Sequence, residues 1–130
     1  MSVLGSSKKV LVIEDNTDFI HLLCFALSQM GHEVEYANNG TEGIMKARDM
    51  KPDIIFCDIG LPGASGFEVA RAIREDTSLK NVYMIALTGY AGLSEIGLAL
   101  DSGFNLHMPK PVSINDLMKS IDKADVSPQA

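Results

Sequence analysis

Short runs of apolar residues alternate along the chain with longer segments in which apolar residues recur every three or four positions. Most of the runs are uninterrupted and rich in Val and Ile, which is typical of parallel strands buried on both faces. They predict five strands, at residues 10–13, 32–37, 53–57, 82–87 and 104–108. The strict alternation of strand and helix predicts the α/β class, with a doubly wound five-stranded parallel sheet and helices on both faces.

The segments between the strands predict helices, several of which have recognisable ends. The first begins at Asn16 or Thr17, either of which can cap its amino end, and it ends at Gly31. Its apolar residues recur at helical spacing: Phe19, Leu22, Leu23, Ala26, Leu27 and Met30. The last begins at Ser113, which with Asp116 forms the pattern of a capping box. The other helices are predicted at residues 41–50, 67–75 and 93–102. Ser65 or Gly66 is the predicted cap of the helix at 67–75, and the glycines of GLPGASG at 60–66 indicate a turn before it.

Polar residues lie at the carboxyl ends of four of the predicted strands. Glu14 and Asp15 follow the first strand, Asp58 follows the third, Thr88 follows the fourth, and Lys110 lies just past the fifth. In a doubly wound sheet the ligand binds at this edge, beside the point where the strand order reverses. The five side chains are therefore predicted to meet in one pocket.

A pocket with three carboxylates needs a cation, since two such charges about 4 Å apart repel by about 4 kcal/mol at an effective dielectric of about 20. Oxygen ligands of this kind favour Mg2+ over Zn2+, and Lys110 supplies further positive charge. The set suits phosphoryl transfer with a carboxylate as nucleophile. Asp58 is the predicted acceptor because it stands alone after the central strand, whereas Glu14 and Asp15 are adjacent and indicate a metal-holding pair. Thr88 would donate a hydrogen bond to a phosphoryl oxygen.

Composition narrows the class of protein and its partners. Residues 1–130 fit a single domain, with an ordered core predicted at about 8–124 and flexible ends at 1–7 and 125–130. The net charge of −6 argues against direct binding of nucleic acid. No apolar run approaches the roughly 18 residues of a membrane span. Cys24 and Cys57 lie in apolar runs as expected for free thiols, which favours the cytoplasm.

Four stretches of the sequence resemble the CheY-like receiver domains of response regulators and hybrid histidine kinases. They are VIEDN at 12–16, CDIGLPGASGFEVAR at 57–71, ALTGY at 86–90 and KP at 110–111, within a resemblance from about residue 9 to residue 121. The resemblance implies the flavodoxin-like strand order 2-1-3-4-5. GFNLHMPKPVSINDL at 103–117 is more similar to receivers of hybrid kinases than to those of DNA-binding regulators.

The resemblance implies the ligands of a magnesium ion. Asp15, Asp58 and the backbone carbonyl of Gly60 would bind Mg2+, and Glu14 would act mainly through water. Glu14 stands where the family more often has Asp, a replacement that the family tolerates.

It also implies which residues respond to phosphorylation. Thr88 and Lys110 would contact the phosphoryl group, and Tyr90 would move inward on activation, so that Thr88 and Tyr90 form a switch. The Lys110–Pro111 peptide bond is expected to be cis, as in many relatives. Pro109 is a departure, because a residue other than proline is usual before the lysine.

By this resemblance the chain is a signalling receiver and not an enzyme, beyond catalysing its own Mg2+-dependent phosphorylation and dephosphorylation. The phosphoryl group would come from a histidine kinase or a histidine phosphotransfer protein that docks near the first helix. A downstream effector protein would bind the face formed by the fourth helix, the fifth strand and the fifth helix. No direct contact with nucleic acid or membrane is expected, and the cytoplasm is the expected location.

Other functions fit less well. An FMN-binding flavodoxin has a hydroxyl-rich phosphate loop, whereas EDN at 14–16 would repel a phosphate without a metal. A phosphatase of the haloacid dehalogenase type needs a DxD motif on the first strand, which this chain lacks. An adaptor that keeps the fold without being phosphorylated is the main alternative, and the presence of all the expected residue types counts against it.

Overall fold

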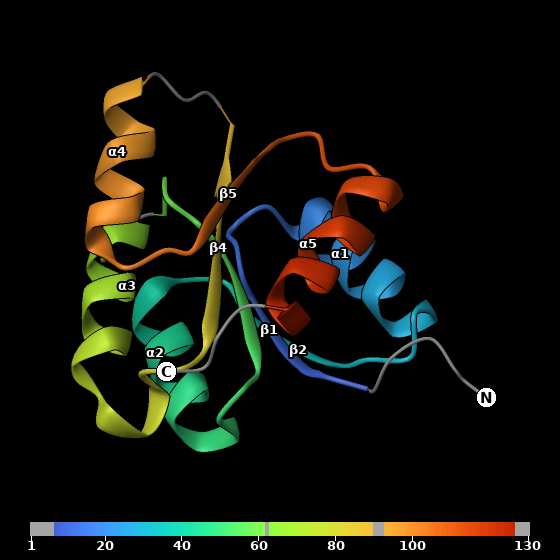
Figure 1. Ribbon diagram of the computed structural model, residues 1–130, viewed down its shortest axis with the longest axis horizontal. Helices are drawn as coiled ribbons and strands as arrows, with labels where there is room; N and C mark the ends of the chain where they lie inside the picture. Colours follow the sequence, from blue (N-terminus) through green and yellow to red (C-terminus); the bar gives the residue numbers. More distant parts are fainter. Residues whose placement is uncertain (1–6, 62, 90–92, 127–130) are drawn as a thin grey trace.

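The computed structural model describes residues 7–61, 63–89 and 93–126. Strands and helices alternate along these residues (Figure 1). The strands are β1 (Lys9–Ile13), β2 (Glu33–Ala37), β3 (Ile54–Asp58), β4 (Tyr83–Thr88) and β5 (Leu106–Pro109). The helices are α1 (Thr17–Gln29), α2 (Gly40–Met50), α3 (Gly66–Glu75), α4 (Leu93–Ser102) and α5 (Ile114–Val126), and a short 3-10 helix, η1 (Thr77–Leu79), follows α3.

The five strands form one parallel sheet in the order β2-β1-β3-β4-β5. Helices α1 and α5 cover one face, and α2, α3 and α4 cover the other (Figure 1). The predicted doubly wound fold and its strand order 2-1-3-4-5 are therefore confirmed. Within the described residues no helix is both long and apolar enough to cross a membrane.

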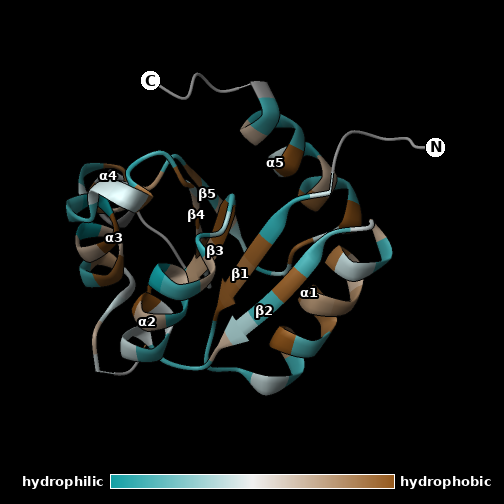
Figure 2. Cartoon of the chain, turned by 90° about the horizontal axis from the view of Figure 1, so that it is seen from below, coloured by the Kyte–Doolittle hydropathy of each residue, from teal (hydrophilic) through white to brown (hydrophobic). Residues whose placement is uncertain are grey.

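The central strands are apolar between their ends because each contributes to two core layers. In β3, Ile54 and Phe56 pack in the layer under α1 and α5, whereas Ile55 and Cys57 pack in the layer under α2, α3 and α4. Figure 2 shows β1 as mainly hydrophobic, with hydrophilic residues distributed over the outer helices. Alternating side chains of a doubly covered strand both enter the core, so no polar position is tolerated between them.

Capping side chains place the helix starts beside the strand ends. Asn16 caps α1, its Oδ1 accepting a hydrogen bond from the N–H of Phe19 at 2.9 Å. Ser65 caps α3 through a capping box with Glu68. The sequence offered two candidate caps for each of these helices, and in each case the structure uses one of them, Asn16 for α1 and Ser65 for α3.

The start of β5 differs from the prediction, which began that strand at residue 104. The chain before β5 is bound by Arg74 of α3, whose guanidinium donates to the carbonyl of Gly103 at 2.8 Å and to Oδ1 of Asn105 at 2.8 Å. The N–H of Asn105 still donates to the carbonyl of Met84 in β4 at 2.8 Å, but the N–H of Met84 donates to Oδ1 of the Asn105 side chain at 2.7 Å. Regular strand pairing therefore begins only at Leu106. Hydrophobic pattern alone does not reveal such a contact.

Candidate functional site

Acidic side chains from two neighbouring strands meet at the carboxyl edge of the sheet. Residues Ile13 of β1 and Cys57 of β3 are paired in register, so the residues that follow them, Glu14 and Asp58, lie at adjacent strand ends. One carboxylate oxygen from each of Glu14, Asp15 and Asp58 lies within 4.8 Å of the others. The topology thus brings together the three acids that the sequence singled out.

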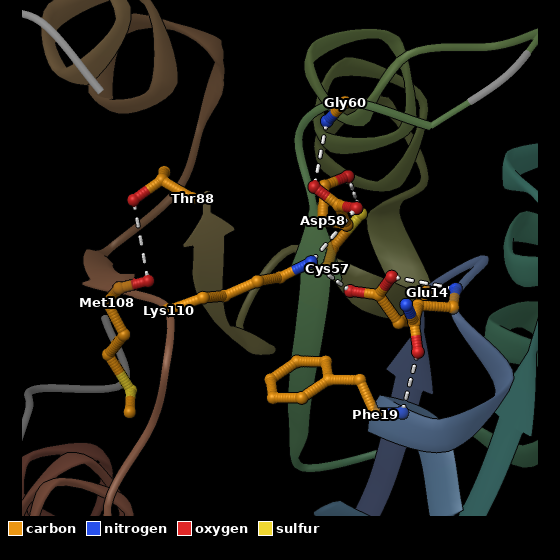
Figure 3. A network of polar contacts seen from close by, with 9 residues as sticks. Glu14, Phe19, Cys57, Asp58, Gly60, Thr88, Met108 and Lys110 are labelled. Carbon is orange, nitrogen blue, oxygen red and sulfur yellow. Dashed lines mark hydrogen bonds and ion pairs between the residues drawn. The ribbon is translucent and has the colours of Figure 1, made fainter. Parts of the chain in front are cut away.

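Lys110 reaches into this acidic cluster from the loop after β5. Its Nζ lies 2.6 Å from Oε1 of Glu14 and 3.3 Å from Oδ2 of Asp58 (Figure 3). Desolvation lowers the pKa of Lys110, but the two carboxylates outweigh this effect and raise the pKa above its ordinary value. The ammonium is therefore charged and lies between two anionic groups.

Glu14 is the most deeply buried of the three acids, with no exposed surface. Its Oε2 accepts a hydrogen bond from the N–H of Asn16 at 2.9 Å, and its Oε1 has the Lys110 ammonium as partner. Burial raises the pKa of Glu14, the contacts with Lys110 and Asn16 partly oppose this, and Asp58 raises it further. Glu14 is thus directed at Lys110, whereas the exposed Asp15 faces solvent.

Asp58 ends β3 and is 8% exposed. Its Oδ1 accepts a hydrogen bond from the N–H of Gly60 at 2.9 Å, and its Oδ2 faces Lys110. The preceding residue, Cys57, is fully buried, and burial first, then Asp58 and Glu14, raises the pKa of its thiol far above the ordinary value. The thiol stays neutral, so it does not compete with the carboxylate as a nucleophile.

Gly66, at the start of α3, allows the helix to approach the backbone of Asp58 closely. A Cβ at position 66 would lie 2.5 Å from the carbonyl oxygen of Asp58 and 2.5 Å from Cα of Ile59. The sequence suggested only that this glycine belongs to a turn or a cap.

The Thr88 side chain has a different partner from the one expected after phosphorylation. Thr88 is buried at the end of β4, and its hydroxyl donates to the carbonyl of Met108 at 3.5 Å, away from Asp58 (Figure 3).

The Lys110–Pro111 peptide bond is cis, as the sequence predicted. Tyr90, the other residue of the expected switch, lies outside the described residues.

Phe19 is a neighbour of the site that sequence reasoning missed. The centroid of its ring lies 4.9 Å from Nζ of Lys110 (Figure 3). The helical pattern assigned Phe19 only to an apolar face. Its position in the first turn of the helix that starts at the acidic strand end is the signal that could have identified it. Beside it lies a cavity of about 340 Å3 lined by Asn16, Phe19, Leu22, Lys110, Pro111 and Val112.

Negative charge exceeds positive charge among these groups, since three carboxylates share one ammonium. The exposed position of Asp15 leaves the cluster accessible from solvent. Oxygen donors with unbalanced charge fit a hard divalent cation such as Mg2+, which keeps positions free for water and phosphate oxygens. The arrangement can therefore hold such a cation next to the Asp58 carboxylate.

A second cavity, of about 360 Å3, lies at the opposite, amino edge of the sheet. Its charged groups have partners within the protein, because Lys8 forms an ion pair with Asp125 and Asp53 accepts a hydrogen bond from the N–H of Lys9. Among the described residues, no acidic cluster like that around Asp58 lies at this edge.

Comparison with known proteins gives consistent similarities over nearly the whole chain. The profile of the response regulator receiver domain matches residues 10–122. The polar-differentiation response regulator DivK of Brucella anthropi is 31% identical over 114 residues, which cover 88% of this chain and 93% of that protein.

Solved structures of response regulators and receiver domains have the same fold. Chemotaxis protein CheY4 of Vibrio cholerae superposes with a TM-score of 0.87 at 26% identity, covering 92% of this chain and 99% of that one. A second structure is the receiver domain of a sensor histidine kinase from Pseudomonas aeruginosa, described with a magnesium ion coordinated in the active-site cleft. It superposes with a TM-score of 0.86 at 25% identity, covering 94% of this chain and 100% of that one.

Proposed function

The chain belongs to the response regulator receiver domain family, and we propose that it accepts a phosphoryl group on Asp58 as part of a two-component phosphorelay. The observation that carries this proposal is the position of the Lys110 ammonium, in contact with both Glu14 and Asp58 at the mouth of an acidic cluster. Phosphoryl transfer to the Asp58 carboxylate requires positive charge beside it, because the transferring oxygens are negatively charged.

The same proposal includes a magnesium site. Asp15, Asp58 and the Gly60 carbonyl would hold Mg2+, with Glu14 acting through water. When bound, the ion would neutralise charge on the phosphoryl oxygens. The clustering of the three carboxylates supports this assignment, and the magnesium in the Pseudomonas receiver is a parallel from a related domain.

In the transfer step the Asp58 carboxylate would form an oxygen–phosphorus bond as the phosphorus–nitrogen bond of a phosphohistidine breaks. The departing imidazole nitrogen would take a proton from water. The N–H of Gly60 orients the carboxylate by its hydrogen bond to Oδ1. Lys110, already 3.3 Å from Oδ2, would neutralise the charge of the transferring group.

Phosphorylation would then rearrange the surrounding contacts. A phosphoryl group adds about −1.5 to −2 charge and strong acceptor oxygens. Thr88 would exchange its long hydrogen bond to Met108 for one to a phosphoryl oxygen, and Tyr90 would follow as the second switch residue. The face formed by α4, β5 and α5 would carry this change to an effector protein.

The donor of the phosphoryl group would be a histidine kinase or a histidine phosphotransfer protein. Leu22 and Phe25 of α1 are 63% and 65% exposed, and Leu22 lines the cavity beside Lys110 together with Pro111 and Val112. We call these four residues the docking patch. An apolar patch next to the acceptor suits a partner that must bring its histidine to Asp58. The free thiols of Cys24 and Cys57 favour a cytoplasmic location for this exchange.

Intact-mass spectrometry tests the acceptor. Wild type is incubated with Mg2+ and acetyl phosphate, beside Asp58→Asn and the matched control Asp53→Asn, whose changed residue precedes the same strand. We expect wild type and Asp53→Asn to gain the mass of one phosphoryl group and Asp58→Asn to gain none. No gain in wild type would favour a phosphorylation-independent adaptor, and an equal gain in Asp58→Asn would move the acceptor elsewhere.

A further inference from the structure

The Lys110 ammonium has a third neighbour that carries no formal charge. The ring centroid of Phe19 lies 4.9 Å from Nζ, within the distance at which the negative face of an aromatic ring attracts a cation. Glu14 and Asp58 are the other two neighbours (Figure 3). The ammonium therefore lies among two carboxylates and one ring.

Phe19 and Glu14 are both positioned by Asn16. The N–H of Asn16 donates to Oε2 of Glu14 at 2.9 Å, and its Oδ1 accepts from the N–H of Phe19 at 2.9 Å. The Phe19 side chain also packs against the core layer under α1 and α5. The helix cap thus holds the Glu14 carboxylate and the backbone of Phe19, and the packing of the Phe19 side chain orients its ring.

Lys110 needs such a restraint more than the acids do. Its side chain has a flexible four-carbon stem, is 23% exposed and starts from a loop. Its ion pair with Glu14 holds the ammonium toward Glu14. If Asp58 is the acceptor, however, the ammonium must turn toward the phosphoryl group. A ring attracts the ammonium over a broad face, so this contact can persist while the anionic partner changes.

We propose that Phe19 is a positioning residue that keeps the Lys110 ammonium over the acidic cluster before and during phosphorylation of Asp58. The kinetic part of this inference rests on the proposed acceptor function; the contact itself does not. Position 19 therefore contributes to the rate of phosphorylation through Lys110.

The contact can be measured in the unphosphorylated protein. Protons of the Lys110 side chain next to the ring should resonate upfield in a 1H–13C spectrum. We expect this shift to be lost in Phe19→Leu and kept in Phe19→Tyr, which retains the ring. Tyr36→Leu is the matched control, because Tyr36 makes the corresponding contact with Lys46 at 5.5 Å. That variant should move signals of Lys46 and leave those of Lys110 in place.

The role is tested by the rate of phosphorylation with acetyl phosphate and Mg2+. We expect Phe19→Leu to react about five times more slowly than wild type, the size of effect that one cation–π contact gives, and Phe19→Tyr to react at the wild-type rate. In a Lys110→Gln background, Phe19→Leu should cause no further loss. Thermal melts of each variant show that it is folded, and Phe19→Met replaces Phe19→Leu if that protein is unstable.

The outcomes separate the two proposals. The role of Phe19 would be overturned, with Asp58 still the acceptor, by any of three results. The Lys110 protons of wild type could show no upfield shift, or Phe19→Leu could be phosphorylated at the wild-type rate. Phe19→Leu could also slow phosphorylation by the same factor in the Lys110→Gln background as in wild type. A wild-type protein that gains no phosphoryl group would overturn the acceptor function and with it the kinetic role, and the spectrum would still decide the contact.

Discussion

The three carboxylates of the site differ in their access to solvent. Glu14 is fully buried against Lys110, Asp58 is nearly buried, and Asp15 is exposed. A buried charge is costly without a partner, so Glu14 depends on Lys110, whereas Asp15 remains available to a ligand from solvent. Residues of the same chemical type thus acquire different roles from their burial.

At position 66 the absence of a side chain is required by the packing. A Cβ there would lie 2.5 Å from backbone atoms of Asp58 and Ile59, so Gly66→Ala must displace the start of α3 or the end of β3. We expect a loss of roughly 1–3 kcal/mol in the free energy of unfolding and slower phosphorylation, measured by urea titration and by acetyl phosphate kinetics.

Gly97→Ala is the matched control for Gly66→Ala. Gly97 lies within α4, and a Cβ there would meet no atom within 4 Å outside its own helix. We expect about 0.5–1 kcal/mol of stabilisation, because alanine loses less backbone entropy in a helix. Equal effects of the two substitutions would contradict the close approach at Gly66.

His32 should make stability depend on pH. Its Nδ1 accepts a hydrogen bond from the N–H of Lys8 at 3.0 Å. Burial lowers the pKa of His32 below the ordinary 6.5, Lys8 lowers it further, and Asp125 opposes this in part. The folded protein binds this proton more weakly than the unfolded chain, so the contribution of His32 to stability is lost as the pH falls from about 7 through the folded pKa.

Urea titrations between about pH 5 and about pH 8 measure this dependence. We expect the free energy of unfolding of wild type to decrease toward acid more steeply than that of His32→Gln, which cannot be protonated. Parallel profiles for the two proteins would show that His32 does not contribute.

At the scale of elements, helix α1 has two apolar faces with different uses. Ile20, Leu23 and Leu27 are buried against the sheet, whereas Leu22 and Phe25 are among the most exposed large apolar side chains of the described residues. Periodicity grouped Leu22 with the core positions. The structure instead places it on the exposed side of α1, beside the cavity at Lys110, because a helix with apolar residues on most of its circumference can turn only one stripe toward the sheet.

Substitutions in the docking patch test where the partner protein binds, separately from the chemistry at Asp58. Leu22→Gln combined with Phe25→Gln should slow phosphoryl transfer from a phosphorylated histidine protein by at least about tenfold, as loss of apolar hot-spot residues does. The rate with acetyl phosphate should not change, because this small donor does not need the docking patch and both substitutions leave Asp58 and Lys110 in place.

Met45→Gln, on the exposed surface of α2 on the other face of the sheet, is the control. It should leave both rates at the wild-type value. A normal rate of protein-to-protein transfer in the double variant would place the partner elsewhere.

At the scale of the whole molecule, excess negative charge at one edge of the sheet should link folding to divalent cations. Three carboxylates from the ends of two strands lie together only in the folded chain, so a cation that binds them stabilises that state. Mg2+ at about 100 times its dissociation constant should stabilise the fold by about 2.7 kcal/mol and raise the melting temperature on the order of 10 °C.

Calorimetry with and without Mg2+ measures this shift, and removal of the ion by a chelator should reverse it. Asp15→Asn should reduce the shift strongly, because it removes the most exposed ligand. Asp122→Asn, an exposed change on α5, should keep it. A shift of the same size in Asp15→Asn would show that the cation binds elsewhere.

The sequence by itself determined the layered fold and the edge at which the site lies. Both depend on local information: uninterrupted apolar runs indicate strands covered on two faces, and the polar residues directly after them must emerge at the carboxyl ends of parallel strands. Glu14, Asp58 and Thr88 could be selected on this basis alone.

Only the tertiary structure decided which contacts those residues make. The burial of Glu14 and the position of the Phe19 ring beside Lys110 follow from how α1 and the loop after β5 come together. The contact of Thr88 with Met108 follows from the pairing of β4 with β5. Such contacts join residues far apart in the chain, and their geometry depends on helix rotation and side-chain rotamers. No local pattern of polar and apolar residues encodes those quantities.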